Sequence, residues 1–134
     1  MTSIYEKYIL LIDDDPDILN LFSDFFILNG FRCILFHSAN DAINYLENNN
    51  SSFCSMVISD YCMNEMNGIE LIKTINNKFN NNGNIKFILM STFLKEQVNN
   101  VLNSKLEKLK IDNILEKPIK LERLKSINLE LLST

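Results

Sequence analysis

The chain has 134 residues, of which 46% are hydrophobic and 22% are charged, and its formal net charge is −4. This length and composition predict a single globular domain over residues 1–134 and exclude a disordered chain. The apolar runs are far too short to span a bilayer, and the acidic balance argues against a nucleic-acid surface. The first residues show no secretory signal, and the three cysteines lack a paired metal spacing, so we expect a cytoplasmic protein with free thiols.

Five short apolar runs predict strands, and amphipathic stretches after each of them predict five helices. Asp15 and Ser38 are good N-cap residues, and Pro16 suits a first helical turn. The strands are expected at 8–12, 31–36, 56–60, 86–90 and 113–115. The helices are expected at 16–28, 39–47, 68–79, 98–109 and 120–132.

Alternating strands and helices require right-handed crossovers and a parallel sheet that is covered on both faces. We therefore predict an α/β fold, with a doubly wound five-stranded parallel sheet of order 2-1-3-4-5 and five helices. In this order the topological switch point lies between the first and third strands. Asp13 and Asp14 should then lie beside Asp60, where ligands bind in such sheets.

Other polar groups are expected at the same edge of the sheet, namely Ser91 and Thr92 after the fourth strand and Lys117 after the fifth. Three adjacent carboxylates repel one another unless a cation compensates them, and Mg²⁺ suits a site with few protein ligands. A carboxylate beside Mg²⁺ and a lysine can attack phosphorus and form an aspartyl phosphate. This pattern indicates a metal–carboxylate site suited to phosphoryl transfer.

Each of these residues also has a simpler structural interpretation. Asp15 is expected only to cap a helix and is excluded from the site, and Asp13 or Asp14 alone could be another cap. Ser91 could begin the following helix, and Lys117 could be a solvated loop lysine. Their coincidence at the strand ends of one alternating pattern favours a functional site.

The segments Ile12-Asp13-Asp14-Asp15-Pro16, Ile58-Ser59-Asp60, Met90-Ser91 and Glu116-Lys117-Pro118 resemble the receiver (CheY-like) domain of two-component response regulators, which has a flavodoxin-like fold. The resemblance implies that Asp60 is the phosphoacceptor and that its donor is a histidine kinase or a histidine phosphotransfer protein. It implies that Mg²⁺ is held by Asp13, Asp14, Asp60 and the backbone carbonyl of Cys62. It also implies that Ser91 and Lys117 contact the phosphoryl group, with Thr92 beside them.

Several positions depart from the usual receiver pattern. Asn64 and Asn67 replace a proline and an aspartate that are common in the loop after the phosphoacceptor, and Thr92 replaces a small residue. Ile114 stands where many receivers carry the aromatic residue that rotates on activation. Phe93 lies where receivers influence access of the hydrolytic water, and we hypothesise that its apolar bulk slows loss of the phosphoryl group.

The resemblance implies a signalling switch and not a metabolic enzyme, because the domain catalyses only its own phosphoryl transfer and slow autodephosphorylation. An unknown downstream protein is expected to contact the surface around 93–132, and the chain is expected to be a monomer or a weak homodimer. One alternative is a phosphorylation-independent docking module. Another is a haloacid-dehalogenase-type phosphatase, whose Asp-x-Asp pattern Asp13 and Asp15 nominally satisfy, although no later acidic pair follows a strand.

Overall fold

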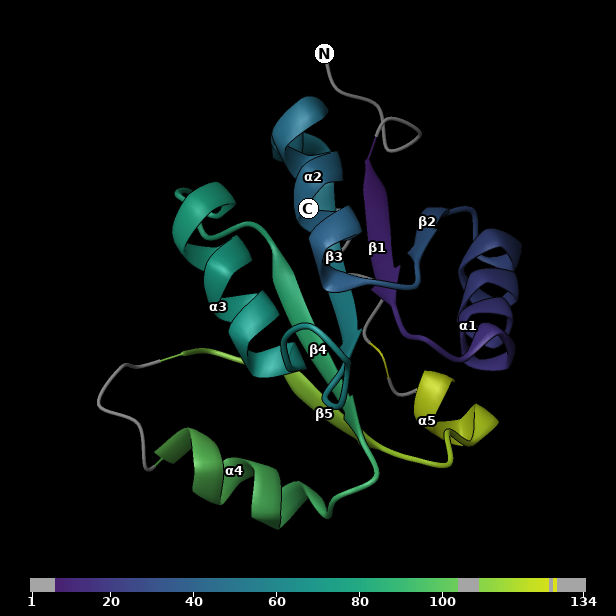
Figure 1. The fold of residues 1–134 in the computed structure, drawn as a ribbon. Coiled ribbons are helices and arrows are strands. Elements are labelled where there is room, and N and C mark those ends of the chain that lie inside the picture. The colour runs from purple at the N-terminus through teal and green to yellow at the C-terminus, as the bar shows by residue number, and fades with distance from the viewer. Residues whose placement is uncertain (1–6, 104–108, 126, 128–134) are drawn as a thin grey trace.

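The computed structural model of the protein describes residues 7–103, 109–125 and 127. Five parallel strands form one sheet in the order β2-β1-β3-β4-β5, as the sequence predicts (Figure 1). The strands are β1 (Tyr8–Ile12), β2 (Arg32–Phe36), β3 (Cys54–Asp60), β4 (Lys86–Ser91) and β5 (Asn113–Glu116). The sheet has its switch point between β1 and β3, and both strands direct their carboxyl ends to the same edge.

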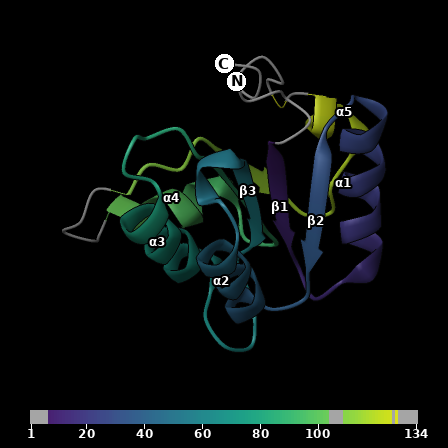
Figure 2. The same ribbon diagram turned by 90° about the horizontal axis from the view of Figure 1, so that it is seen from above.

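Five α-helices connect and cover the strands: α1 (Pro16–Leu28), α2 (Ala39–Asn48), α3 (Gly68–Phe79), α4 (Lys95–Asn103) and α5 (Leu121–Lys125). A short 3₁₀ helix, η1 (Ser51–Phe53), precedes β3. Figure 2 shows α1 and α5 on one face of the sheet and α2 and α3 on the other. Asp15 and Ser38 cap α1 and α2 as predicted, because their side chains accept from the amides of Asp17 and Asp41.

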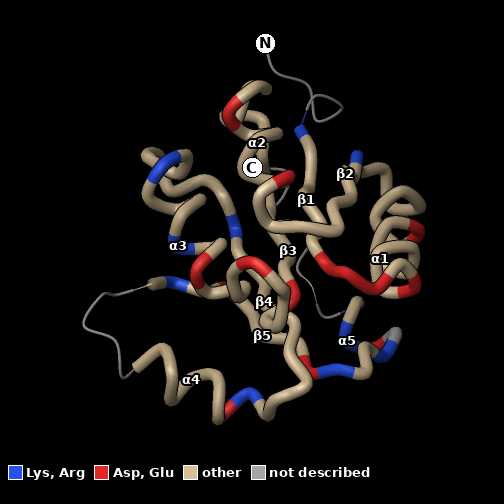
Figure 3. The backbone as a smooth tube through the Cα atoms, in the orientation of Figure 1, with Lys and Arg blue, Asp and Glu red and all other residues tan. Residues whose placement is uncertain are grey.

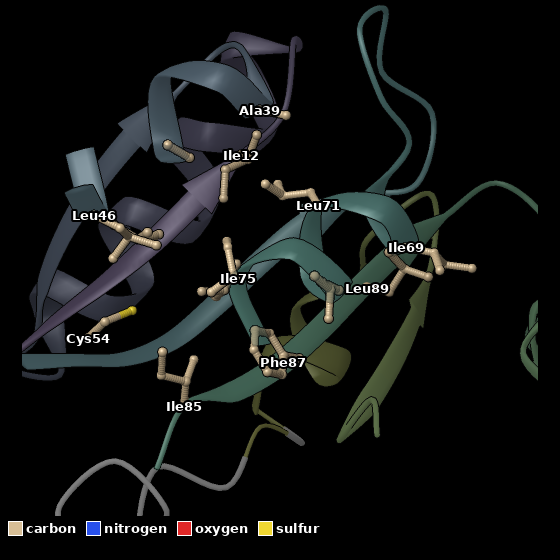
Figure 4. Close-up of a cluster of buried hydrophobic side chains, with 14 of the residues drawn as sticks. Ile12, Ala39, Leu46, Cys54, Ile69, Leu71, Ile75, Ile85, Phe87 and Leu89 are labelled. Carbon is tan, nitrogen blue, oxygen red and sulfur yellow. The ribbon is translucent and has the colours of Figure 1, made fainter. Parts of the chain in front are cut away.

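The two faces of the sheet bury two separate hydrophobic cores, because alternate residues of a strand point in opposite directions. In β1, for example, Leu10 and Ile12 contribute to the core beneath α2 and α3, whereas Ile9 and Leu11 contribute to the core beneath α1. Figure 4 shows the first of these cores in detail. Burial on both faces explains why β1 is apolar at every position rather than at alternate ones.

The structure corrects some of the expected boundaries. β3 begins at Cys54, two residues before the expected start, and α4 begins at Lys95 and is described as far as Asn103, whereas residue 109 is not helical. Leu109 lies outside any helix and packs against the core beneath α2 and α3. Residues 104–108 of the expected helix at 98–109, and residues 126 and 128–132 of the last expected helix, lie outside the described residues. Within the described part of the chain, no helix has the length and apolarity needed to cross a bilayer.

Candidate acidic site at the switch point of the sheet

The expected residues meet at the carboxyl edge of the sheet. Asp13 and Asp14 directly follow β1, and Asp60 is the last residue of β3. Each of the three offers a carboxylate oxygen, and these oxygens all lie within 4.8 Å of one another. Figure 3 shows the acidic segment that leads from β1 into α1 and the acidic end of β3 near it.

Lys117 joins two of these carboxylates. Its Nζ lies 2.9 Å from Asp13 Oδ2 and 3.1 Å from Asp60 Oδ1, and all three side chains are largely buried. Burial opposes the positive charge of Lys117, but its hydrogen bonds to Asp13 and Asp60 and their negative charges outweigh burial and raise its pKa. Lys117 is therefore a fixed cation inside the site and not a solvated loop lysine.

Burial works against the carboxylates. The pKa of Asp13 is raised, chiefly because its side chain is removed from water, although it accepts hydrogen bonds from the Asp15 amide and from Lys117. The pKa of Asp60 is raised for the same main reason, against the opposing effects of Lys117 and of the Cys62 amide, which donates to it. The negative charge of Asp14 adds to the rise at Asp60.

A divalent cation fits this arrangement. Lys117 neutralises one unit of charge between Asp13 and Asp60, while Asp14 is exposed and pairs with no cation among the described residues. Three clustered carboxylates with one lysine leave an excess of negative charge, and carboxylate oxygens are ligands that Mg²⁺ prefers. The Cys62 thiol is exposed, and participation of its backbone carbonyl in metal binding stays a prediction.

Asp14 borders a small hollow of about 60 Å³ beside this cluster. The exposed His37 lies on the hollow's rim together with Asn64 and Glu65 of the loop after β3. Within the described part of the chain, His37 contacts neither Asp13 nor Asp60 through a hydrogen bond or an ion pair. We therefore assign His37 no chemical role.

Ser91 is buried at the end of β4 and contacts the chain that follows it. Its Oγ accepts a hydrogen bond of 2.9 Å from the Phe93 amide, and its carbonyl accepts one of 2.7 Å from the Lys117 amide. Ser91 thus lies between the lysine of the site and the segment that leads into α4. Thr92, by contrast, is exposed.

Two aromatic residues extend from the site toward α4. The Tyr61 ring contacts the Phe93 ring edge-to-face, with centroids 5.8 Å apart. Together with Gln97, Val98 and Val101 they line a hollow of about 260 Å³. Tyr61 directly follows Asp60, and sequence reasoning did not single it out.

Gly68 fixes the loop after Asp60. Its amide donates to the Tyr61 carbonyl at 2.8 Å, and a Cβ at this position would lie only 2.3 Å from the Asp60 carbonyl oxygen. It would also lie 2.6 Å from Leu89 Cδ1. Glycine is therefore required here because the start of α3 packs directly against the backbone of Asp60.

Glu116, which sequence reasoning also missed, connects β5 to α4. Its Oε1 accepts a hydrogen bond of 3.0 Å from the Lys95 amide at the first residue of α4. A carboxylate at this position satisfies an otherwise unpaired amide and interacts favourably with the helix dipole. Glu116 precedes Lys117, so the residue before the site lysine caps the helix after Ser91. The sequence contains no local signal for this contact, because 21 residues separate the two partners.

Asp15 does not join the cluster. Its side chain accepts from the Asp17 amide at 2.9 Å, which occupies it as the cap of α1. The Asp-x-Asp arrangement that a haloacid-dehalogenase-type site needs is therefore absent from this loop, since only Asp13 of that pair points into the site.

A doubly wound parallel sheet with clustered carboxylates and a lysine at its switch point defines a flavodoxin-like domain with an acidic site. The response regulator receiver domain family matches this chain over residues 9–128, so the chain belongs to that family. A relative in Staphylococcus saprophyticus subsp. saprophyticus, the heme response regulator HssR, is 36% identical over 70 residues. That match covers 52% of this chain and 30% of the relative, so the matched segment spans less than a third of the relative's length.

Solved structures share the fold. A two-component response regulator from Clostridium difficile has a TM-score of 0.74 and 24% identity, with 94% of this chain and 95% of the other covered. The response regulator TrrA from Thermotoga maritima, in complex with Mg²⁺ and BeF, has a TM-score of 0.70 and 23% identity, with 93% and 98% covered. A CheY-like receiver domain protein from Methanospirillum hungatei has a TM-score of 0.72 and 24% identity, with 93% of each chain covered. These similarities confirm the predicted receiver fold.

Proposed function

We propose that Asp60 accepts a phosphoryl group from a phosphohistidine donor in a reaction that depends on Mg²⁺, and that this switches the domain between two signalling states. One observation carries the proposal. Asp60 ends β3 within 4.8 Å of the Asp13 and Asp14 carboxylates and 3.1 Å from Lys117 Nζ, at the edge of the sheet where ligands bind. The chain is a receiver domain, and this is the carboxylate that can act as nucleophile there.

In the proposed reaction, a carboxylate oxygen of Asp60 attacks phosphorus. The new P–O bond forms as the P–N bond to the donor imidazole breaks, and the imidazole nitrogen leaves with the electron pair. Mg²⁺, held by Asp13, Asp14, Asp60 and the Cys62 carbonyl, would neutralise the charge on the phosphoryl oxygens. Lys117 Nζ lies 3.1 Å from Asp60 Oδ1, so its positive charge would also stabilise the phosphoryl oxygens. Burial of the site strengthens this electrostatic interaction.

Ser91 is proposed to report the arrival of the phosphoryl group. Its hydroxyl accepts from the Phe93 amide in this structure, so its own proton is available for donation to a phosphoryl oxygen. A hydroxyl drawn toward the phosphoryl group would change or break the bond to the Phe93 amide. The segment before α4 would then respond, and with it the aromatic pair of Tyr61 and Phe93. Thr92 is a further candidate donor, although it is exposed.

The remaining features of the proposal concern partners and context. The donor is a histidine kinase or a histidine phosphotransfer protein, and a downstream protein reads the surface formed by residues 93–132. Residues 1–134 act as one receiver unit, as a monomer or weak homodimer in the cytoplasm. Because the domain catalyses only its own phosphorylation and the slow loss of the phosphoryl group, its role is signalling.

Acetyl phosphate and Mg²⁺ test the proposal without the natural donor. Wild-type protein should gain one phosphoryl group, seen by intact-protein mass spectrometry and mapped to Asp60 after reductive trapping of the acyl phosphate. Asp60→Asn should gain none. Asp24→Asn serves as the matched control, because it removes one exposed carboxylate from α1 without touching the site.

Two results would contradict the proposal. Labelling of Asp60→Asn at the wild-type level would show that another residue is the acceptor. A wild-type protein that gains no phosphoryl group, and whose tyrosine fluorescence stays unchanged with Mg²⁺ and beryllofluoride, would favour the docking module instead.

A further inference from the structure

We infer that Asn82 is a site of spontaneous covalent modification, at which the side-chain amide is lost and an isoaspartyl linkage forms. Each of the three glycines in the chain follows an asparagine, giving the pairs Asn29-Gly30, Asn67-Gly68 and Asn82-Gly83. An asparagine before glycine is prone to intramolecular attack, since no side chain shields the following amide nitrogen and the two groups are already adjacent. The structure distinguishes sharply among the three.

Water is the only co-reactant that the chemistry needs. The Gly83 amide loses its proton to hydroxide, and its nitrogen forms a C–N bond to the side-chain carbonyl carbon of Asn82. The bond from that carbon to the side-chain nitrogen then breaks, and this nitrogen takes a proton from water and leaves as ammonia. The resulting five-membered succinimide is then opened by water at either of its two carbonyl groups. One opening gives aspartate, and the other gives isoaspartate, in which the main chain runs through the former side chain.

Asn67 and its glycine are held firmly. The Asn67 side chain caps α3 by accepting from the Glu70 amide at 2.8 Å, and the Gly68 amide donates to the Tyr61 carbonyl at 2.8 Å. Gly68 is also buried, and atoms of Asp60 and Leu89 surround its α-carbon closely. Attack by the Gly68 nitrogen would require two hydrogen bonds to break and a packed backbone to turn.

Asn29 is protected in a similar way at the end of α1. Its side-chain amide donates to the Phe25 carbonyl at 2.7 Å, and the Gly30 amide donates to the Ile27 carbonyl at 3.0 Å. Both groups that must meet in the succinimide are therefore engaged by the last turn of the helix.

Asn82 lies in the exposed turn between α3 and β4. Within the described part of the chain, no hydrogen bond holds its side chain, and the Gly83 amide makes a single turn bond of 3.1 Å to the Asn80 carbonyl. A side chain at Gly83 would meet nothing within 4 Å, so the turn has room to rearrange. Asn82 also borders an open hollow of about 210 Å³, which gives water access to the reacting groups.

The surrounding structure should survive the change. Asn80 closes the turn independently of Asn82, because its Oδ1 accepts from the Ile85 amide at 2.9 Å and its Nδ2 donates to Asn76 at 2.8 Å. The turn precedes β4, so it lies at the opposite edge of the sheet from Asp60. The modification adds one negative charge and a backbone kink there without reaching the phosphorylation site.

Ageing of the intact protein at mildly alkaline pH, followed by peptide mapping, tests the inference. Isoaspartate is detected by transfer of a methyl group from S-adenosylmethionine with a protein isoaspartate methyltransferase. Asn82 should convert roughly tenfold faster or more than Asn29 or Asn67, because each further hydrogen bond that must break slows attack by about that factor. Asn82→Gln should remove most of the signal, and Asn81→Gln, which changes the neighbouring exposed asparagine, should keep it.

A parallel experiment in urea separates structure from sequence. In the unfolded chain the three pairs should convert at rates within a few-fold of one another, since the protecting hydrogen bonds are gone. Equal rates at all three pairs in the native protein would overturn the inference. So would a native Asn82 that converts no faster than Asn67, or an Asn82→Gln variant that keeps the wild-type signal.

Discussion

Asp13 and Asp60 are buried carboxylates that must be ionised to hold a metal ion, although burial favours their protonated forms. The pKa of each is raised by desolvation, and Lys117 offsets that effect only in part. Keeping both carboxylates ionised therefore costs folding free energy in the metal-free protein, and the proposed phosphoryl transfer requires this ionised state. We predict that repulsion among these carboxylates destabilises the folded protein without a cation, and that a bound cation removes this repulsion.

This cost predicts a pH dependence of stability. The pKa of the Asp60 carboxyl is higher in the folded protein than the 3.8 expected in the unfolded chain. Such a carboxyl stabilises the folded state fully when the pH is below 3.8. This stabilisation is lost as the pH rises through the folded pKa. Without Mg²⁺, Asp60→Asn should therefore equal wild type near pH 3.8 and become the more stable protein as pH rises toward 7. Urea unfolding across this range measures the difference, with Asp24→Asn as control. A stability advantage of Asp60→Asn over wild type that shrinks or reverses in sign with rising pH would contradict the raised pKa of Asp60.

At the scale of elements, α4 is attached to the site through its first turn. The Ser91 hydroxyl accepts from the Phe93 amide, the Gln97 side chain accepts from the Leu94 amide, and Glu116 accepts from the Lys95 amide. Two of these three acceptors lie at the site or next to it. Ile114 is buried and stands where many receivers carry an aromatic residue, so these contacts would offer a route from a phosphoryl group on Asp60 to α4.

Removing the Glu116 carboxylate should loosen the start of α4. Glu116→Ala leaves the Lys95 amide without its partner, and loss of a helix cap costs about 1 kcal/mol. Hydrogen exchange of the α4 amides should therefore become about fivefold faster. Glu116→Gln keeps an oxygen acceptor and should recover most of the protection. Unchanged exchange in Glu116→Ala would show that the contact does not hold the helix.

The sequence predicted helices and strands well where the apolar spacing and the capping residues indicated the same boundaries. It predicted them less well where the apolar spacing continued beyond the end of a helix. Apolar spacing continues through Leu109, yet Leu109 lies outside a helix and is partly buried against the core beneath α2 and α3. The convergence of Asp13, Asp14 and Asp60 followed from strand order alone. The pairing of Lys117 with two carboxylates and the capping by Glu116 did not, because both depend on side-chain conformations across distant segments.

At the scale of the whole molecule, binding of Mg²⁺ at the proposed site is expected to be thermodynamically linked to folding. A cation that binds only the folded protein stabilises it by about 2.7 kcal/mol at a hundred times its dissociation constant. Mg²⁺ should therefore raise the thermal unfolding temperature of the wild type. Asp14→Asn removes the exposed carboxylate among the proposed ligands and should abolish most of the rise. An ionic-strength control with KCl separates site binding from screening, and equal Mg²⁺-induced shifts in both proteins would argue against the site.

Gly68 gives the molecule an asymmetry between two neighbouring helices. Gly68 has no side chain, so the first residue of α3 packs directly on the carbonyl of Asp60, and this helix cannot shift without moving the proposed phosphoacceptor. The start of α4 is held in part by hydrogen bonds to the side chains of Ser91 and Glu116, which can exchange partners. We therefore expect α3 to act as the fixed support of the switch and α4 as its moving part, so that partners sensitive to phosphorylation approach from the side of α4.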